Sequence, residues 1–137
     1  MGVFNARNER FLLYCMLALF LLYTAYNLTV YYIYLNTDDF PEEFWDTSVR
    51  TEFLFMALMI VLSGFYFRSC GAGSKISFDF MLFYYCTVPL SLFYCSYRYK
   101  GFFKGTALII FWITAYLVPY WTWYIVSTWT YWDYESP

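Results

Sequence analysis

The amino-acid sequence predicts an all-α integral membrane protein with four transmembrane helices joined by short connections. The first observation is composition, since 62% of the 137 residues are hydrophobic and 13% are charged, whereas soluble domains carry about 25% charged residues. The second observation is a set of four uncharged stretches: Phe11–Leu35, Phe53–Phe67, Phe80–Tyr97 and Gly105–Trp132. A spanning helix needs about 20 mostly apolar residues, so these stretches set the number of predicted spans.

We expect a single transmembrane domain with spans at approximately 11–35, 48–67, 78–97 and 105–132. The second span is the weakest, because it reaches full length only if Arg50 lies near the interface, where long side chains extend toward water. The alternative is three spans plus one re-entrant or interfacial segment. A membrane β-barrel is disfavoured, because its strands alternate polar and apolar residues and the stretches of this chain do not.

Two prolines fall inside the predicted spans, Pro89 in the third and Pro119 in the fourth. Proline lacks a backbone N–H, so it frees the carbonyl four residues earlier, here at Tyr85 and Ala115. We expect each proline to bend its helix. Broken helices also form ion-binding sites in transporters, which is the alternative function for these two positions.

The predicted topology gives no orientation. With four spans, the N-terminus, the second connection and the C-terminus share one side of the membrane. That side carries Arg7, Arg10, Arg68 and Lys75, and the other carries Arg50, Arg98, Lys100 and Lys104. The positive-inside rule compares basic residues on the two sides, and here the comparison is a tie.

The sequence offers little for catalysis, and we expect no enzyme activity, cofactor or metal. It contains no histidine, the commonest general base and metal ligand, and its four cysteines lack metal-ligand spacing. Asp79 is the most notable carboxylate, because it begins the third predicted span. A helix N-terminus stabilises such a charge, while the functional alternative is an ion or proton relay in a small transporter or channel.

Two groups of residues are candidates for binding. Basic residues alternate with aromatic ones in the third connection, and could hold an anionic lipid such as cardiolipin or form an ordinary interfacial belt: Arg98, Lys100, Lys104, Tyr97 and Tyr99. Tryptophan is concentrated after Pro119 beyond what one interface needs, and Trp is favoured at protein contacts. The candidate partner contacts are Trp121, Trp123, Trp129 and Trp132.

These observations favour a non-catalytic structural subunit of a larger membrane protein complex, with the mitochondrial inner membrane as the expected location. We expect other membrane subunits and lipids as partners, and neither nucleic acid nor a small-molecule substrate. One alternative is a tetraspan scaffold or sorting protein of the endoplasmic reticulum or plasma membrane. A second alternative is a small transporter or channel that uses Asp79.

Overall fold

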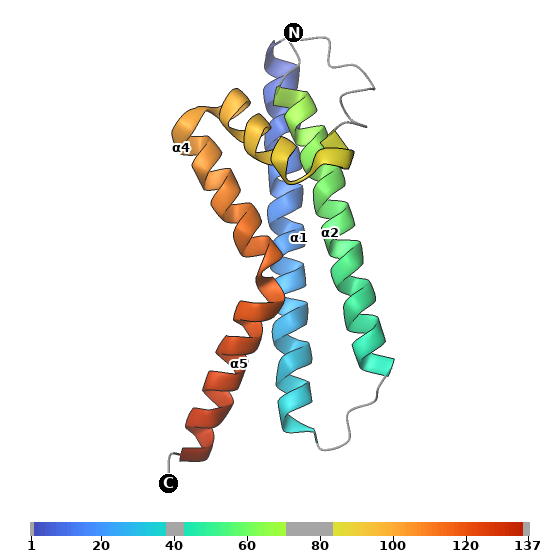
Figure 1. Cartoon of the computed structure of the whole chain (residues 1–137), viewed down its shortest axis with the longest axis vertical. Helices are drawn as coiled ribbons and strands as arrows, with labels where there is room; N and C mark the ends of the chain where they lie inside the picture. The colour runs from blue at the N-terminus through green and yellow to red at the C-terminus, as the bar shows by residue number, and fades with distance from the viewer. Residues whose placement is uncertain (1, 38–42, 71–83, 136–137) are drawn as a thin grey trace.

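The computed structural model describes residues 2–37, 43–70 and 84–135, and the elements within these ranges are helices. The predicted all-α fold is therefore confirmed for this part of the chain. The long helices in the described ranges are α1 (Gly2–Asn36), α2 (Glu43–Cys70), α4 (Leu90–Tyr116) and α5 (Val118–Glu135). Figure 1 shows α1 in the middle, with α2 beside it on one side and α5 leaning away from it on the other.

The helices provide fewer membrane crossings than the sequence predicts. Residues Asn8–Asn36 of α1 and Trp45–Cys70 of α2 are each long and apolar enough to span a bilayer. The helices α4 and α5 meet that requirement together, as a pair bent by 62°. The described residues thus hold two candidate spans, or up to three if the bent pair is one span, and four spans are not confirmed.

Large side chains fill the interface between α1 and α2. Tyr23 stacks on Phe55 with ring centroids 4.0 Å apart, and Tyr34 meets Trp45 edge to face at 5.2 Å. Met59 is fully buried in the same core. Because lipid is as apolar as these side chains, close packing holds such helices together in a membrane.

The third predicted span, 78–97, is not one straight helix. Its described part begins with a helical turn at 84–87, and the chain then turns at Val88 and Pro89 before α4 begins. The Ser91 hydroxyl donates to the Tyr84 carbonyl across this turn at 3.0 Å. Pro89 therefore marks a turn between two helical segments, where the sequence predicts a bend within one span. Residues 78–83 lie outside the described residues.

Within α4 the chain changes direction at Gly101. Its φ of 71° and ψ of −178° fall in a region that only glycine occupies readily. Residues 90–100, which we call the crossing arm, pass in front of α1 and α2 in Figure 1, and residues 102–116, the descending arm, run back along α1. The chain therefore changes direction within the predicted third connection, 98–104, which joins the crossing arm to the descending arm.

The predicted bend before Pro119 is present, and its polar groups are partly satisfied. The helix axis changes by 62° between Tyr116 and Val118, and the Leu117 N–H donates to the Ile113 carbonyl at 3.0 Å. The indole N–H of Trp121 donates to the Thr114 carbonyl at 3.1 Å. A side chain thus supplies a donor to a backbone carbonyl beside the bend.

Most of the described hydroxyl groups on α5 bond to their own helix. Thr128 Oγ1 donates to the Tyr124 carbonyl at 2.7 Å, and Thr130 Oγ1 donates to the Val126 carbonyl at 2.9 Å. Thr122 Oγ1 donates to the Val118 carbonyl in the same way. Serine and threonine commonly bond back to a carbonyl three or four residues earlier.

The two arms of α4 touch closely at Gly105, which gives a stability prediction. A Cβ at Gly105 would lie 2.8 Å from the Ser96 carbonyl oxygen. Because this neighbour is backbone, Gly105→Ala forces the arms apart, and we expect a loss of about 1–3 kcal/mol. The measurement is thermal unfolding in detergent, followed by thiol labelling of the buried Cys95 in a chain whose other cysteines are alanine.

Gly64→Ala is the matched control for Gly105→Ala. A Cβ at Gly64 would lie 2.8 Å from the Tyr85 hydroxyl oxygen, which is the movable end of a side chain. We therefore expect a much smaller decrease in melting temperature for Gly64→Ala. Equal decreases for the two variants would contradict the close approach of the α4 arms.

Candidate functional site

One end of the molecule is built from three helices. Lys100, at the end of the crossing arm, forms an ion pair with Glu9 near the start of α1. Its Nζ atom also lies 5.2 Å from the centroid of the Tyr66 ring on α2. Tyr99 faces Phe67 of α2, with centroids 6.4 Å apart. The start of α1, the end of α2 and the bend of α4 therefore meet at what we call the basic end.

The predicted lipid-binding residues gather at this end, but they are not equivalent. Arg98 and Lys104 are exposed, whereas only 14% of the Lys100 side chain is accessible. Tyr97 stacks on Phe102 across the bend, with centroids 6.0 Å apart, so it braces the turn. Lipid binding at this cluster stays a prediction, and Lys100 has a second role as an internal ion-pair partner.

The predicted partner-contact tryptophans also differ among themselves in exposure and in their contacts within the protein. Trp121 bonds to the Thr114 carbonyl at the bend. Trp123 is partly exposed and contacts two tyrosines of α1, at centroid distances of 5.2 Å from Tyr31 and 5.8 Å from Tyr34. Trp129 is 72% exposed. Trp132 lies in α5, and its side chain is outside the described residues.

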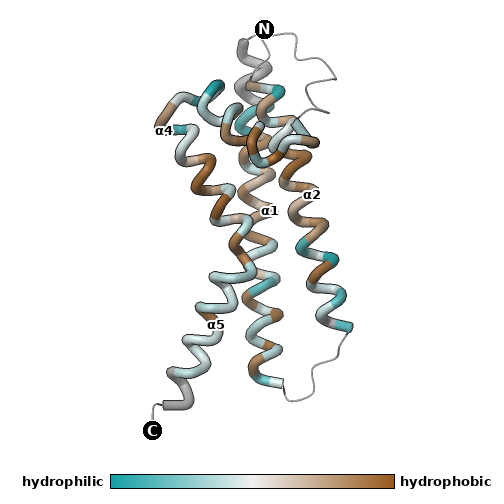
Figure 2. The backbone as a smooth tube through the Cα atoms, viewed as in Figure 1, coloured by the Kyte–Doolittle hydropathy of each residue, from teal (hydrophilic) through white to brown (hydrophobic). Residues whose placement is uncertain are grey.

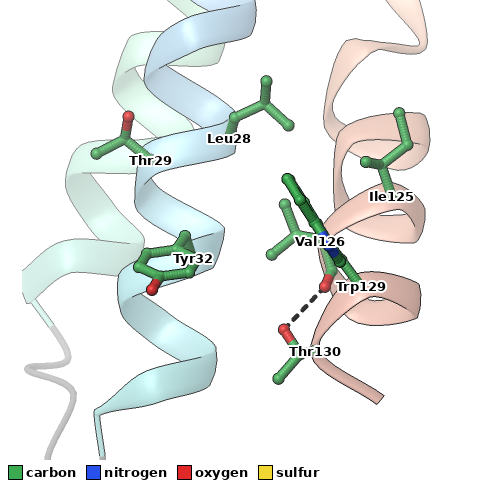
Figure 3. Close-up of a pocket in the computed structure, with 7 residues that line it drawn as sticks. All are labelled: Leu28, Thr29, Tyr32, Ile125, Val126, Trp129 and Thr130. Carbon is green, nitrogen blue, oxygen red and sulfur yellow. Dashed lines mark hydrogen bonds between the residues drawn. The ribbon is translucent and has the colours of Figure 1, made fainter. Parts of the chain in front are cut away.

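A groove opens between α1 and α5, where the two helices diverge below the bend (Figure 1). It encloses about 710 Å³. Figure 3 shows Leu28 on α1 reaching toward α5, where Val126 lies opposite. We call this the α1/α5 groove, and the residues that line it are Leu28, Thr29, Tyr32, Ile125, Val126, Trp129 and Thr130.

The polar atoms of the α1/α5 groove fall into two kinds. The hydroxyls of Thr29 and Thr130 donate to carbonyls of their own helices. Within the described part of the chain, the Tyr32 hydroxyl and the Trp129 indole N–H have no hydrogen-bond partner, and both side chains are more than 60% exposed. Tyr and Trp donors seek partners when they are buried, so whatever fills this groove should offer acceptors.

A second hollow lies between α2 and α4, beneath the crossing arm. It encloses about 420 Å³. Its walls come from α2 at Met56 and Ile60, from the turn at Pro89 and from the descending arm at Ile109 and Trp112. Most of the lining is aliphatic or aromatic, so the surface is suited to lipid chains.

Sequence reasoning missed the partner of Lys100. Glu9 lies 91 residues away along the chain, and no local spacing rule connects the two. Tyr66 was missed for the same reason. Asp79, the candidate relay carboxylate, lies outside the described residues. Among the residues that the structure describes, no group of three or more His, Cys, Asp or Glu side chains could hold a metal ion.

Comparisons with known proteins add no relative to these observations. No family model matches the chain, and neither the curated proteins nor the solved structures compared with it include a match.

Proposed function

We propose that the protein is a non-catalytic structural subunit of a larger membrane protein complex, and that it holds a transmembrane helix of a partner in the α1/α5 groove. The observation that carries this proposal is Trp129, an exposed aromatic side chain of α5 that lines the groove, with further exposed rings on the rest of the α5 surface. Tyr120, Tyr124, Trp129 and Tyr131 are each between 69% and 73% exposed. Aromatic residues of this kind dominate the energetics of protein interfaces.

The composition of the groove supports a helix as its occupant. Membrane helices approach one another where small residues such as threonine lie at the contact, and Thr29 and Thr130 lie on opposite walls of the groove. Tyr32 and Trp129 add donors that a partner's side chains or carbonyls can satisfy. Lipid tails supply no acceptor, so a groove filled by acyl chains alone would leave these donors unpaired.

Site-specific crosslinking tests this proposal. A photoreactive benzophenone residue at position 129 should form an adduct with one distinct polypeptide in native membranes. Phe53 on α2 is the matched control, because it is aromatic, 77% exposed and outside the groove. At position 53 we expect lipid adducts, and lipid adducts alone at both positions would contradict the proposal.

The crosslinked partner should then depend on the groove residues. Trp129→Ala should reduce recovery of that polypeptide in mild detergent by about tenfold or more, because truncating a hot-spot residue costs about 2 kcal/mol. Phe53→Ala should leave recovery unchanged. Equal recovery with both variants would show that the groove does not hold the partner.

The compartment is a separate part of the proposal. We propose the mitochondrial inner membrane, on the basis of the small chain and its high aromatic content. Fluorescence microscopy of a tagged full-length chain tests the location. Retention in the endoplasmic reticulum or at the plasma membrane would favour the scaffold or sorting role instead.

A further inference from the structure

The fold separates charges that the sequence distributes evenly between two sides. The contacts of Lys100 with Glu9 and Tyr66 place the bend of α4 beside the start of α1 and the end of α2. Arg98 and Lys104 therefore lie at the same end as Arg10 and Arg68, whereas a four-span topology places them across the membrane. The crossing arm causes this difference, because it passes in front of α1 and α2 and does not run parallel to them as a span would.

The four cations on the rim of the basic end are available to the surroundings. Arg10, Arg68, Arg98 and Lys104 are all exposed. Glu9 is the only carboxylate at this end among the described side chains, and its ion pair with Lys100 uses its charge internally. The basic end thus has a strong positive charge that no described group neutralises.

The opposite end carries mainly negative charge on its described side chains. It contains the first three turns of α2, where the described charged side chains are Glu43, Asp46, Arg50 and Glu52. Figure 1 places this part of α2 beside the end of α1, far from the bend of α4. Among the described residues, three carboxylates and one cation lie there, so the molecule is electrically polar along its long axis.

We infer that the basic end faces the cytoplasmic side of the membrane, or the matrix side in a mitochondrion, where its four exposed cations contact anionic lipid headgroups. Basic residues near the ends of spans stay on this side during insertion. The same leaflet carries anionic lipids that attract Lys and Arg at the surface. This inference concerns orientation and does not depend on the proposed partner in the α1/α5 groove.

Aromatic side chains on the bend are suited to the same surface. Phe102 and Phe103 are 71% and 87% exposed, and they lie between Arg98 and Lys104 in the chain. Large rings at the headgroup level, with cations beside them, are typical of an interfacial segment. The crossing arm and its bend would therefore rest in the interface of the leaflet that the cations contact.

Cysteine accessibility tests the orientation. The full chain, with its four native cysteines replaced by alanine, is made in bacteria with one new cysteine, at Asn8→Cys for the basic end or Thr37→Cys for the opposite end. Both positions are exposed. A membrane-impermeant maleimide is added outside intact spheroplasts. We expect labelling of the Thr37→Cys chain, and labelling of the Asn8→Cys chain only after the membrane is opened.

A charge variant tests whether the four exposed cations determine the orientation. Arg10→Gln, Arg68→Gln, Arg98→Gln and Lys104→Gln are combined, with Glu9 and Lys100 retained so that the internal ion pair is kept. In this variant the Asn8→Cys probe should become labelled from outside in part of the population. Labelling of Asn8→Cys from outside in the chain with native charges would overturn the inference, and labelling of Thr37→Cys in the same background shows that this background inserts into the membrane.

Discussion

Replacing Glu9 with lysine is expected to destabilise the protein more than replacing it with glutamine. The variant places two ammonium groups together where the protein now has an ion pair between Glu9 and Lys100. Because both side chains are mostly covered, at 14% and 29% exposure, water screens the repulsion poorly. Loss of a charge-assisted hydrogen bond costs about 1.5–3 kcal/mol, and repulsion adds to this. The measurement is the thermal unfolding assay based on Cys95.

Two further variants separate charge from shape at this pair. Glu9→Gln keeps an acceptor for Lys100, so its loss should be smaller than that of Glu9→Lys. The exchange of both residues, Glu9→Lys with Lys100→Glu, should restore most of the stability. Restoration should be incomplete, because the carboxylate has no cation–π contact with Tyr66. An unchanged melting temperature in Glu9→Lys would show that the pair does not form.

Gly101→Ala is expected to open the bend between the two arms of α4. At a φ of 71° and a ψ of −178°, an L-residue is strained by about 1–3 kcal/mol. A Cβ there has nothing within 4 Å, so the effect is conformational and involves no clash. Spin labels at Phe93 and Ile113, which line one hollow from the two arms, should move apart in electron-resonance distance measurements.

D-alanine at position 101 is the control for this prediction. Its allowed regions mirror those of an L-residue, and the mirror image of the Gly101 conformation is ordinary extended backbone. A semisynthetic chain with D-alanine should therefore keep the distance between Phe93 and Ile113, although it carries the same extra methyl group. Equal lengthening with both enantiomers would contradict the observed conformation of Gly101.

Local physical rules predicted part of this fold. Apolar length was sufficient to locate α1 and α2, including the doubtful second segment, which is one of the two helices able to span a membrane alone. The two prolines, which lack a backbone N–H, located the bends, since the chain changes direction next to both Pro89 and Pro119. These signals depend on a few consecutive residues, so they can be read without knowing the tertiary structure.

The number of crossings and the sidedness of the charges could not be predicted in this way. Hydrophobicity does not distinguish a helix that crosses a bilayer from one that packs across the sides of other helices, as residues 90–100 do. When that segment is counted as a span, Arg98 and Lys104 are assigned to the side opposite Arg10 and Arg68, and the basic residues balance. The Glu9–Lys100 contact that corrects this is tertiary, and local spacing does not indicate it.

The internally bonded hydroxyls of α5 have a consequence for how that helix meets lipid. In Figure 2 much of α5 is pale or bluish, because threonine, serine, tyrosine and tryptophan each score as mildly hydrophilic as isolated residues. The oxygens of Thr122, Thr128 and Thr130 are already bound to carbonyls. Thr122 is buried, and Thr128 and Thr130 present mainly their methyl groups to the surroundings. Desolvation of this helix therefore costs less than its residue-by-residue score implies, and α5 is compatible with hydrocarbon despite its pale colour.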